Sequence, residues 1–415
     1  MIKFLHTADI HLDSPLKGLE SHDDAPLEEI RGATRRAFDN LIELALEQEV
    51  RFMLIAGDLF DGDWKDYNTG LFFAKHMGRL AQAGIRVFIV SGNHDAASQM
   101  TKSIPWPKNV NIFSARKAET VKLEELRIAI HGQSYASRAA TGNLTENFPQ
   151  YAPGYFNIGL LHTSLTGREG HENYAPCTVA DLTAKGYDYW ALGHIHKREI
   201  VCENPAIIFP GNLQGRHSRE TGTKGATLVS VTEGCITEIE ECPLDVLRWS
   251  VCPVDLSPCA NTAEVYEEVH AAIQKEQNRN KGKTLALRLQ LEGRCPVHNE
   301  LKARSRQITE ELRGLAAGLG EIWLEKIIFR TTPQTDQAQM TTAESPFFNL
   351  LQAVAGLDFD EERLTAFVPE LASLKSRLPA ELSDGAFLAA DKSENLQDLL
   401  TEVKDLLIAR LHEGE

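Results

Sequence analysis

Apolar and polar positions in the first ninety residues follow two alternating spacings. Short apolar runs at residues 2–6, 52–56 and 86–90 are typical of buried strands. In residues 27–49 and 68–83 the apolar side chains recur every three or four positions, which predicts two helices with one apolar face each. Strands that alternate with helices in this way predict a layered α/β domain whose helices pack on a sheet.

The strand pattern continues to about residue 240, where the organisation of the chain changes. Further strands are expected at residues 127–131, 156–161, 187–192, 207–209, 226–231 and 235–240. Two prolines and a tryptophan then interrupt the pattern between Cys242 and Ser257, and we expect a second domain to begin there.

The second domain has the pattern of a small α+β module. Its predicted elements are a helix with Val265, Val269 and Ile273 on one face, a strand of alternating leucines at 285–291, a helix through 301–315 and a strand at 322–329. A polar stretch follows, and Ser345-Pro346 is a favourable helix start. The predicted divisions are domains at residues 1–245 and 246–332, a linker at 333–344 and a helical tail at 345–415.

The composition fits a folded protein of two or three domains. Of the 415 residues, 42% are hydrophobic, enough to bury a full core. No apolar run approaches the roughly 18 residues of a membrane span, and residues 1–5 lead into a polar segment, so we expect a soluble, cytoplasmic protein. The seven cysteines show no C-x-x-C spacing, which argues against a disulfide framework and a structural zinc site.

The net charge of −16 would usually argue against a nucleic-acid binder. More than half of this excess lies in residues 341–415, which carry 15 acidic and 6 basic side chains. Residues 1–340 are therefore much less acidic. They could still bind a phosphodiester backbone if basic side chains lie beside the binding site.

Five polar motifs each follow a predicted strand, which is where open α/β sheets bind their ligands. We expect the motifs to bring carboxylates, an amide oxygen and imidazoles to one edge of a sheet. They are Asp9-Ile10-His11, Gly57-Asp58-Leu59-Phe60-Asp61, Gly92-Asn93-His94-Asp95, His162, and Gly193-His194-Ile195-His196.

The D-x-H and H-x-H spacings suit metal binding, because residues i and i+2 of extended or looped backbone can turn two donors toward one cavity. Two such pairs indicate two metal ions, and Asp58 is the natural carboxylate to bridge them. Taken singly, a D-x-H motif is more often a capping aspartate beside a surface histidine, and an H-x-H motif is more often a pair of hydrogen-bonded histidines. Five motifs together, each after a strand, favour a metal centre.

On these motifs the chain resembles the calcineurin-like metallophosphoesterase superfamily, whose pattern is D-x-H, G-D-x-x-D, G-N-H-[DE], a single histidine and G-H-x-H. Several segments look like SbcD-type DNA repair exonucleases, above all their YhaO-like bacterial branch: FLHTADIHLDSPL, LIAGDLFD, VSGNHD, LLHTS, ALGHIHK and FPGNLQGRH. The resemblance is specific up to about residue 220. It implies an α/β fold, a layered metallophosphoesterase β-sandwich flanked by helices, with a small α+β capping domain and a helical C-terminal tail.

The resemblance also implies a role for each matching position. One divalent ion would be held by Asp9, His11, Asp58 and His196, and a second by Asp58, Asn93, His162 and His194. Manganese is the usual ion in the family, although oxygen donors with imidazoles also suit iron or zinc. His94 would protonate or position the leaving oxygen during attack by water.

Three further residues are assigned more loosely. Asp61 is a candidate partner of His94, and a turn or helix cap is an equal alternative. Arg216 and His217 follow P-G-N-L-Q-G, a loop that in the family lies beside the metal centre, so they are candidates for binding the DNA backbone. Solvation at the surface is the other interpretation of these two residues.

The leading hypothesis is a manganese-dependent DNA exonuclease subunit of a repair complex. In the resembling family the capping domain helps to position DNA, the tail docks on the coiled-coil base of an SMC-like ATPase, and homodimers are common. A tail that folds back on its own domain is an alternative. The sequence contains no P-loop motif, so any dependence on ATP would come from another chain. A phosphatase, a cyclic-nucleotide phosphodiesterase and a catalytically idle scaffold are alternatives on the same fold.

Overall fold

The computed structural model describes residues 1–14, 27–61, 67–97, 106–138, 140–165 and 174–334, with a few single positions further on. The chain divides into two compact units. The first comprises Met1–Val251, Asn280–Leu287 and Glu321–Glu325, and the second comprises Cys252–Arg279, Arg288–Gly320 and the residues from Lys326 onward. The predicted linker at 333–344 and the predicted helical tail at 345–415 lie almost entirely outside the described residues.

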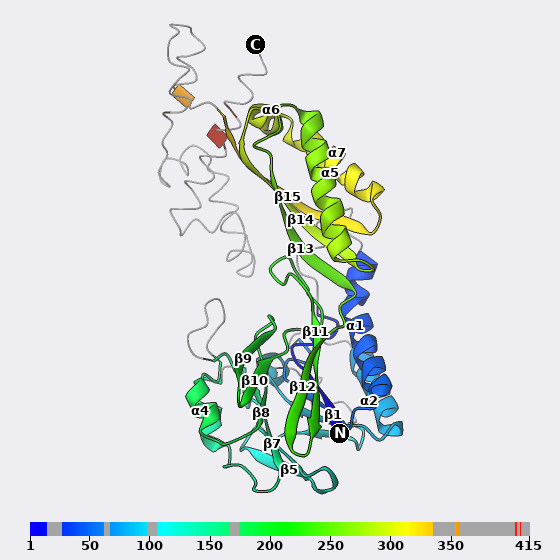
Figure 1. Cartoon of the computed structure of the whole chain (residues 1–415), viewed down its shortest axis with the longest axis vertical. Helices are drawn as coiled ribbons and strands as arrows, with labels where there is room; N and C mark the ends of the chain where they lie inside the picture. Colours follow the sequence, from blue (N-terminus) through cyan, green and yellow to red (C-terminus); the bar gives the residue numbers. More distant parts are fainter. Residues whose placement is uncertain are drawn as a thin grey trace. The chain divides into compact units, whose positions relative to one another are not determined.

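Within the described residues, the first sheet has six strands in the order β12-β11-β1-β2-β3-β4 (Figure 1). Its four neighbouring parallel strands are β1 (Ile2–Thr7), β2 (Phe52–Ala56), β3 (Arg86–Val90) and β4 (Val110–Ile112). Two antiparallel strands extend the sheet, β11 (Gly225–Thr232) and β12 (Cys235–Pro243). Because β1, β2 and β3 are parallel, the loops after them leave from the same edge.

The second sheet also has six described strands, in the order β5-β6-β7-β8-β10-β9. Its parallel strands are β6 (Ile128–Gly132), β7 (Phe156–His162), β8 (Tyr189–Gly193) and β10 (Ala206–Phe209). Antiparallel strands form its two edges, β5 (Glu119–Leu123) and β9 (Glu199–Glu203). The short helices of this unit are α3 (Asn93–Ala97), α4 (Val179–Thr183), η3 (Glu124–Leu126) and η4 (Leu144–Asn147).

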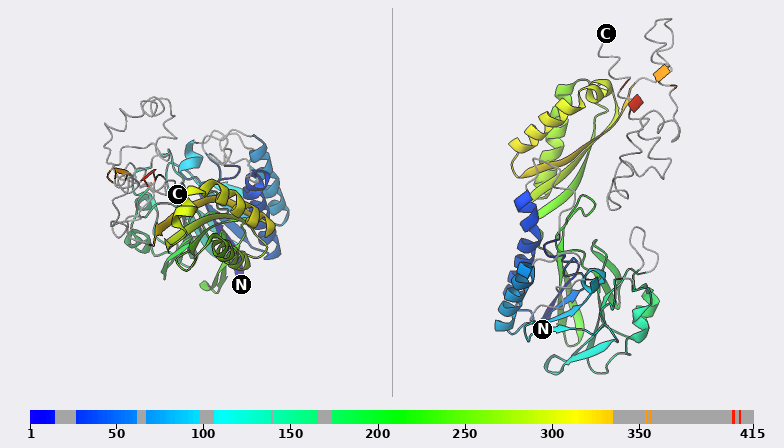
Figure 2. Two further views of the ribbon diagram at one scale, coloured as in Figure 1. Left: turned by 90° about the horizontal axis from the view of Figure 1, so that it is seen from above. Right: turned by 180° about the vertical axis from the view of Figure 1, so that it is seen from behind.

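The two sheets pack face to face, and helices cover their outer faces (Figure 2, right). Between the sheets, Phe4 stacks on Phe52 at 4.9 Å and meets the edge of Tyr189 at 5.3 Å. The outer face of the first sheet packs on α1 (Leu27–Glu47) and α2 (Tyr67–Gln82) through apolar side chains such as Phe38, Leu41 and Phe73. This arrangement confirms the predicted layered β-sandwich flanked by helices.

A three-stranded sheet follows later in the chain, in the order β13-β14-β15. Its strands are β13 (Leu247–Asp255), β14 (Thr284–Cys295) and β15 (Ile322–Pro333), and its helices are α5 (Thr262–Arg279), α6 (His298–Ala303) and α7 (Ser305–Gly318). The side chains expected on the buried face of α5, Val265, Val269 and Ile273, are fully buried. The elements are those of a small α+β module.

The strands β4, β5 and β9 were not expected from the sequence, and two further local predictions differ from the structure. The interruption expected between Cys242 and Ser257 contains β13, which tolerates Pro253 because β13 is an edge strand and Pro253 is exposed on it. The single helix expected through 301–315 is divided into α6 and α7, because Arg304 has φ −102° and ψ 20°, outside the helical range. None of the described helices combines the length and the apolar composition that crossing a bilayer requires.

Candidate metal centre

The five motifs follow strands of two different sheets. The loops after β1, β2 and β3 of the first sheet carry Asp9, Asp58 and Asn93, whereas His162 and His194 stand at the ends of β7 and β8 in the second sheet. The expectation of one sheet edge was therefore wrong. The sandwich brings the carboxyl ends of both sheets together, as the hydrogen bond from the N–H of His194 to Asp9 shows, at 2.9 Å.

Unusual backbone conformations hold these loops close together. Asp9, His11, Asp58 and His194 all have positive φ, of 50°, 45°, 52° and 103°. Residues other than glycine rarely adopt this region, and such strain clusters at functional sites. Gly57 has φ 93°, and a Cβ there would lie 2.4 Å from Nδ1 of His162, so only glycine fits.

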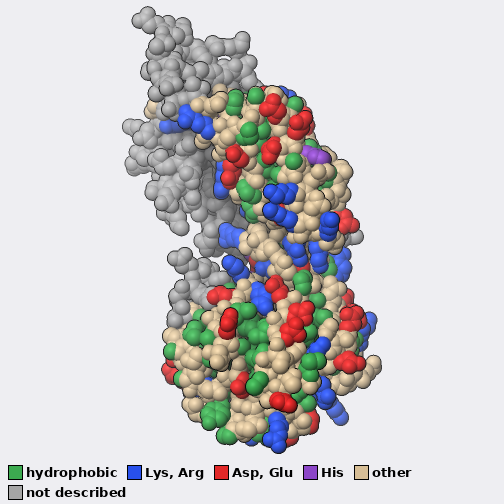
Figure 3. Space-filling view, viewed as in Figure 1, with side chains coloured by type: hydrophobic (Ala, Val, Ile, Leu, Met, Phe, Trp, Pro, Cys, Tyr) green, Lys and Arg blue, Asp and Glu red, His purple; other side chains and the backbone are tan. Residues whose placement is uncertain are grey.

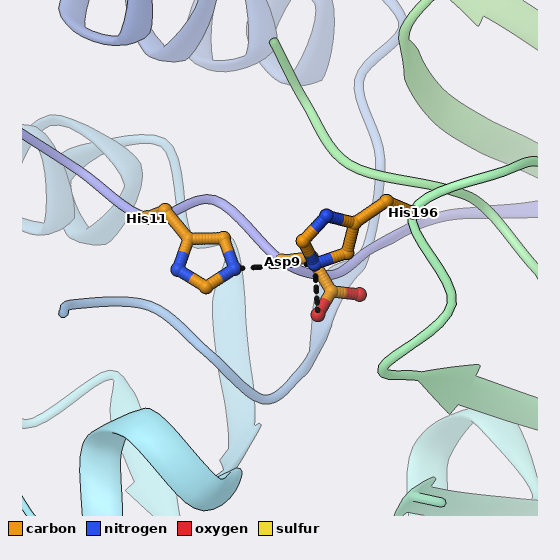
Figure 4. Close-up of side chains that lie close together, drawn as sticks. All are labelled: Asp9, His11 and His196. Atoms are coloured by element: carbon orange, nitrogen blue, oxygen red, sulfur yellow. Dashed lines mark hydrogen bonds and ion pairs between the residues drawn. The ribbon is translucent and has the colours of Figure 1, made fainter. Parts of the chain in front are cut away.

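Asp9, His11 and His196 form the first cluster of donor atoms (Figure 4). Their ligand atoms all lie within 4.8 Å of one another. Nε2 of His196 is 3.3 Å from Nε2 of His11 and 3.6 Å from Oδ1 of Asp9. All three residues come from loops at the same end of the sandwich.

Hydrogen bonds on the far side of each ring assign the protons in this cluster. Nδ1 of His11 donates to Asp61 at 2.8 Å, and Nδ1 of His196 donates to Glu220 at 2.6 Å. When the rings are neutral, each Nε2 then carries a lone pair, and Oδ1 of Asp9 is buried without a hydrogen-bond partner among the described residues. Three acceptors that face one another repel unless a cation lies between them, so this cluster fits a metal ion.

The second cluster, Asp58, Asn93 and His162, has the same character. Nδ1 of His162 donates to the carbonyl oxygen of Ala56 at 2.8 Å, which leaves a lone pair on Nε2. This Nε2 lies 3.0 Å from Oδ1 of Asn93 and 3.5 Å from Oδ2 of Asp58. With this tautomer the atoms that face one another are all acceptors, so the cluster fits a second ion. The ring of His194 lies 5.1 Å from that of His162.

Asp58 is placed between the two clusters. It belongs to one possible ligand group with Asp9 and His162, and to another with His11 and His94. One of its oxygens, Oδ1, also accepts the backbone N–H of His94 at 3.0 Å. This central position suits the bridging role that the sequence predicts for it.

Asp61 contacts two histidines through the same oxygen. Oδ1 lies 2.8 Å from Nδ1 of His11 and 3.0 Å from Nδ1 of His94. Burial alone would lower the pKa of His94, but the hydrogen bond to Asp61 and the charge of Asp58 raise it. Burial would raise the pKa of Asp61, and its hydrogen bonds to His11 and His94 lower it well below its usual range. The His94 side chain remains about one-third exposed, at 34%.

Arg216 lies at the same site, whereas His217 is more peripheral. The guanidinium of Arg216 donates to Ser14 at 3.3 Å and lies 3.7 Å from the carboxylate of Asp61. The side chain of His217 is 54% exposed, and its Nε2 lies 3.4 Å from Oε1 of Glu220. Its Nδ1 accepts the backbone N–H of Arg219 at 3.3 Å. Burial lowers the pKa of His217.

Two further carboxylates lie at the site, and of these Glu220 was not assigned a role from the sequence. Glu220 is buried against His196 and Arg216, and its only sequence signal is that it is the lone acidic residue of the basic stretch G-R-H-S-R-E. Asp95 accepts the backbone N–H groups of Leu59, Phe60 and Gly92, at 3.2, 3.0 and 3.1 Å. It ties the loop after β2 to the loop after β3, and burial together with Asp58 raises its pKa to about 6.

Comparison with known proteins gives consistent matches. Residues 2–198 match the family model of the calcineurin-like phosphoesterases, and residues 249–332 match that of the metallophosphoesterase YhaO middle domain. The chain is 38% identical over 353 residues to the uncharacterized metallophosphoesterase YhaO of Bacillus subtilis (strain 168), which covers 84% of this chain and 85% of that protein.

More distant matches extend the comparison. The DNA double-strand break repair protein Mre11 of Sulfurisphaera tokodaii is 24% identical over 415 residues, covering 95% of this chain and 99% of that protein. Among solved structures, TT1561 of Thermus thermophilus is 15% identical over 59% of this chain and 99% of that chain, with a TM-score of 0.34 that supports no further conclusion.

The match to the calcineurin-like phosphoesterases, together with the candidate ligand clusters, supports a hydrolase that acts on phosphoester bonds with divalent metal ions. The chain belongs to the calcineurin-like metallophosphoesterase family, in its YhaO-like branch, as its motifs predicted.

Proposed function

We propose that the protein is a DNA exonuclease that uses two divalent metal ions, with manganese as the preferred ion. The observation that carries the proposal is the pair of clusters in which buried carboxylate, amide and imidazole groups converge. A relative aligned with 95% of the chain bears the name of a DNA double-strand break repair protein, which supports DNA as the substrate. Two ions held there would supply positive charge to the phosphoryl oxygens and acidify the attacking water.

In this proposal the ligands are shared between two ions. Asp9, His11, Asp58 and His196 hold one ion, and Asp58, Asn93, His162 and His194 hold the other. The buried carboxylates of Asp9 and Asp58 would offset half of the charge of two divalent ions, and the neutral rings would add lone pairs without charge. Asp61 orients His11 and His94 through their Nδ1 atoms.

His94 acts on the leaving oxygen. Its Nδ1 donates to Asp61 at 3.0 Å, so a protonated ring carries its second proton on Nε2. The side chain is partly exposed, which lets Nε2 meet the substrate at the mouth of the site. His94 then transfers that proton to the oxygen that leaves the phosphorus.

Arg216 and His217 bind the backbone of the DNA in this proposal. The Arg216 guanidinium already lies within 4 Å of Asp61, and arginine binds phosphate oxygens through two parallel N–H groups. On the face seen in Figure 3, acidic and basic side chains are interspersed over both units. Such a surface favours local contacts over a broad electrostatic attraction to DNA.

The test is Mn²⁺-dependent cleavage of end-labelled linear duplex DNA by the full chain, beside hydrolysis of a small phosphodiester. His94→Ala should slow DNA cleavage about 100-fold or more while both ions stay bound. Arg216→Ala should raise the KM for DNA about 10- to 100-fold and change the small diester little. The matched control is Arg219→Ala, because Arg219 carries the same charge and is exposed three residues away.

The outcomes separate the possible substrates. Cleavage of DNA that His94→Ala abolishes supports the nuclease. Turnover of the small diester with intact DNA would refute DNA as the substrate of the isolated chain.

The same experiment with an SMC-like ATPase then tests the partner that we propose for the tail at 345–415, and gel filtration tests the proposed homodimer.

A further inference from the structure

Glu220 is a buried carboxylate whose two oxygens are surrounded by hydrogen-bond donors. Only 6% of the residue is exposed. Oε1 accepts from Nδ1 of His196 at 2.6 Å and lies 3.3 Å from Nη2 of Arg216 and 3.4 Å from Nε2 of His217. Oε2 accepts from Nδ2 of Asn212 at 2.9 Å and from the backbone N–H of Arg216 at 2.7 Å. Each of these partners offers a proton to Glu220.

We propose that Glu220 is a positioning residue that holds the ring of His196 in the tautomer and orientation needed to bind the first metal ion. This inference rests on the metal centre of the proposed function. By accepting the proton of Nδ1, the carboxylate leaves Nε2 of His196 as a lone pair that faces Asp9 and His11. A carboxylate in this position also makes the imidazole a stronger ligand.

The loop that carries Glu220 binds the backbone of His196 as well as its ring. The carbonyl oxygen of His196 accepts from Nζ of Lys224 at 2.8 Å and from the backbone N–H of Asn212 at 3.3 Å. Glu220 is thus fixed relative to both the backbone and the ring of His196. The same carboxylate holds Arg216, so one side chain couples a metal ligand to the residue proposed to bind the DNA backbone.

Glutamine is an informative substitution because it has the shape of glutamate but carries one donor group. If the amide NH₂ replaces Oε1, it donates toward Nδ1 of His196 and forces the ring proton onto Nε2, where the ion should bind. If the amide NH₂ replaces Oε2, it faces the N–H groups of Asn212 and Arg216. Neither orientation satisfies all partners, so Glu220→Gln disturbs the tautomer without removing volume.

The experiment measures Mn²⁺ binding to the full chain by equilibrium dialysis and by electron paramagnetic resonance. We expect Glu220→Gln to lower the affinity for one of the two Mn²⁺ ions about 10- to 100-fold and to leave the affinity for the other unchanged. The matched control is Asp245→Asn, since Asp245 is a fully buried carboxylate that pairs with Arg248 at 2.7 Å and Lys283 at 3.8 Å. This control should lower the melting temperature while both ions bind with normal affinity.

Two results would overturn the inference in distinguishable ways. Unchanged affinity for both ions in Glu220→Gln refutes the role of Glu220, and a wild-type chain that binds no Mn²⁺ refutes the metal centre itself. If Glu220→Gln does not fold, the wild-type chain loaded with Zn²⁺ and labelled with ¹⁵N-histidine decides the question. We expect a proton on Nδ1 of His196, identified by its loss in His196→Asn, and a proton on Nε2 instead would refute the proposal.

Discussion

His6 links the two sheets of the sandwich next to the metal centre. Its Nε2 donates to the carbonyl oxygen of Leu192 at 3.1 Å, so its Nδ1 accepts from the hydroxyl of Tyr189 at 2.9 Å. His6 lies near the end of β1, which Asp9 follows, and Leu192 lies near the end of β8, which His194 follows. These two hydrogen bonds therefore join the strands that carry the two halves of the site.

The buried position of His6 makes this link sensitive to acid. Burial lowers the pKa of His6 from 6.5 to about 3, so the folded state keeps the ring neutral while the unfolded chain binds a proton. The stability contributed by this group is complete above pH 6.5 and is lost as the pH falls toward 3, at about 1.4 kcal/mol per pH unit. Between pH 7.5 and pH 4.5 the loss is about 2.5 kcal/mol.

His6→Gln tests this reasoning, because glutamine keeps one acceptor and one donor and does not titrate. We expect the variant to be less stable than the wild type at pH 7.5, because its amide replaces the ring imperfectly. At pH 4.5 its stability relative to the wild type should improve by about 2.5 kcal/mol. The assay is urea unfolding of both metal-free chains, followed by tryptophan fluorescence at the two pH values. A difference between variant and wild type that is the same at both pH values would refute the proposed linkage.

Two other predictions concern the metal centre directly. In Gly92→Ala the new Cβ would lie 2.3 Å from Oδ1 of Asp58 and 2.9 Å from Cε1 of His162, so the ligands must move apart. Phosphodiester turnover should fall about 100-fold, and an unchanged rate would show that the loops adjust freely. Removal of the ions with a chelator should lower the melting temperature, because ions that bind only the folded state stabilise it by about 2.7 kcal/mol at 100 times their dissociation constant. A melting temperature insensitive to both chelator and added Mn²⁺ would contradict a metal centre made of converging acceptors.

Local patterns in the chain were sufficient to predict most of the elements of the sandwich. Apolar runs such as Phe52–Ala56 and Arg86–Val90 are strands where they were expected, because a fully buried strand needs apolar side chains on both faces. The motif residues follow these strands for the same reason, since polar loops can begin only where buried strands end. β13 was missed because an edge strand tolerates Pro253, and local pattern does not show which strand lies at an edge.

The arrangement of the candidate site depends on contacts between distant parts of the chain. Periodicity shows that a strand has a buried face but not which sheet it joins, so the division of the ligands between two sheets was not predictable. The proton positions on His11 and His196 follow from Asp61 and Glu220, which lie 50 and 24 residues away from them in the chain. The residue types that bind metal can thus be read along the chain. Their convergence, their tautomers and their positive φ angles arise only when the two sheets pack, because packing sets which donor faces which acceptor.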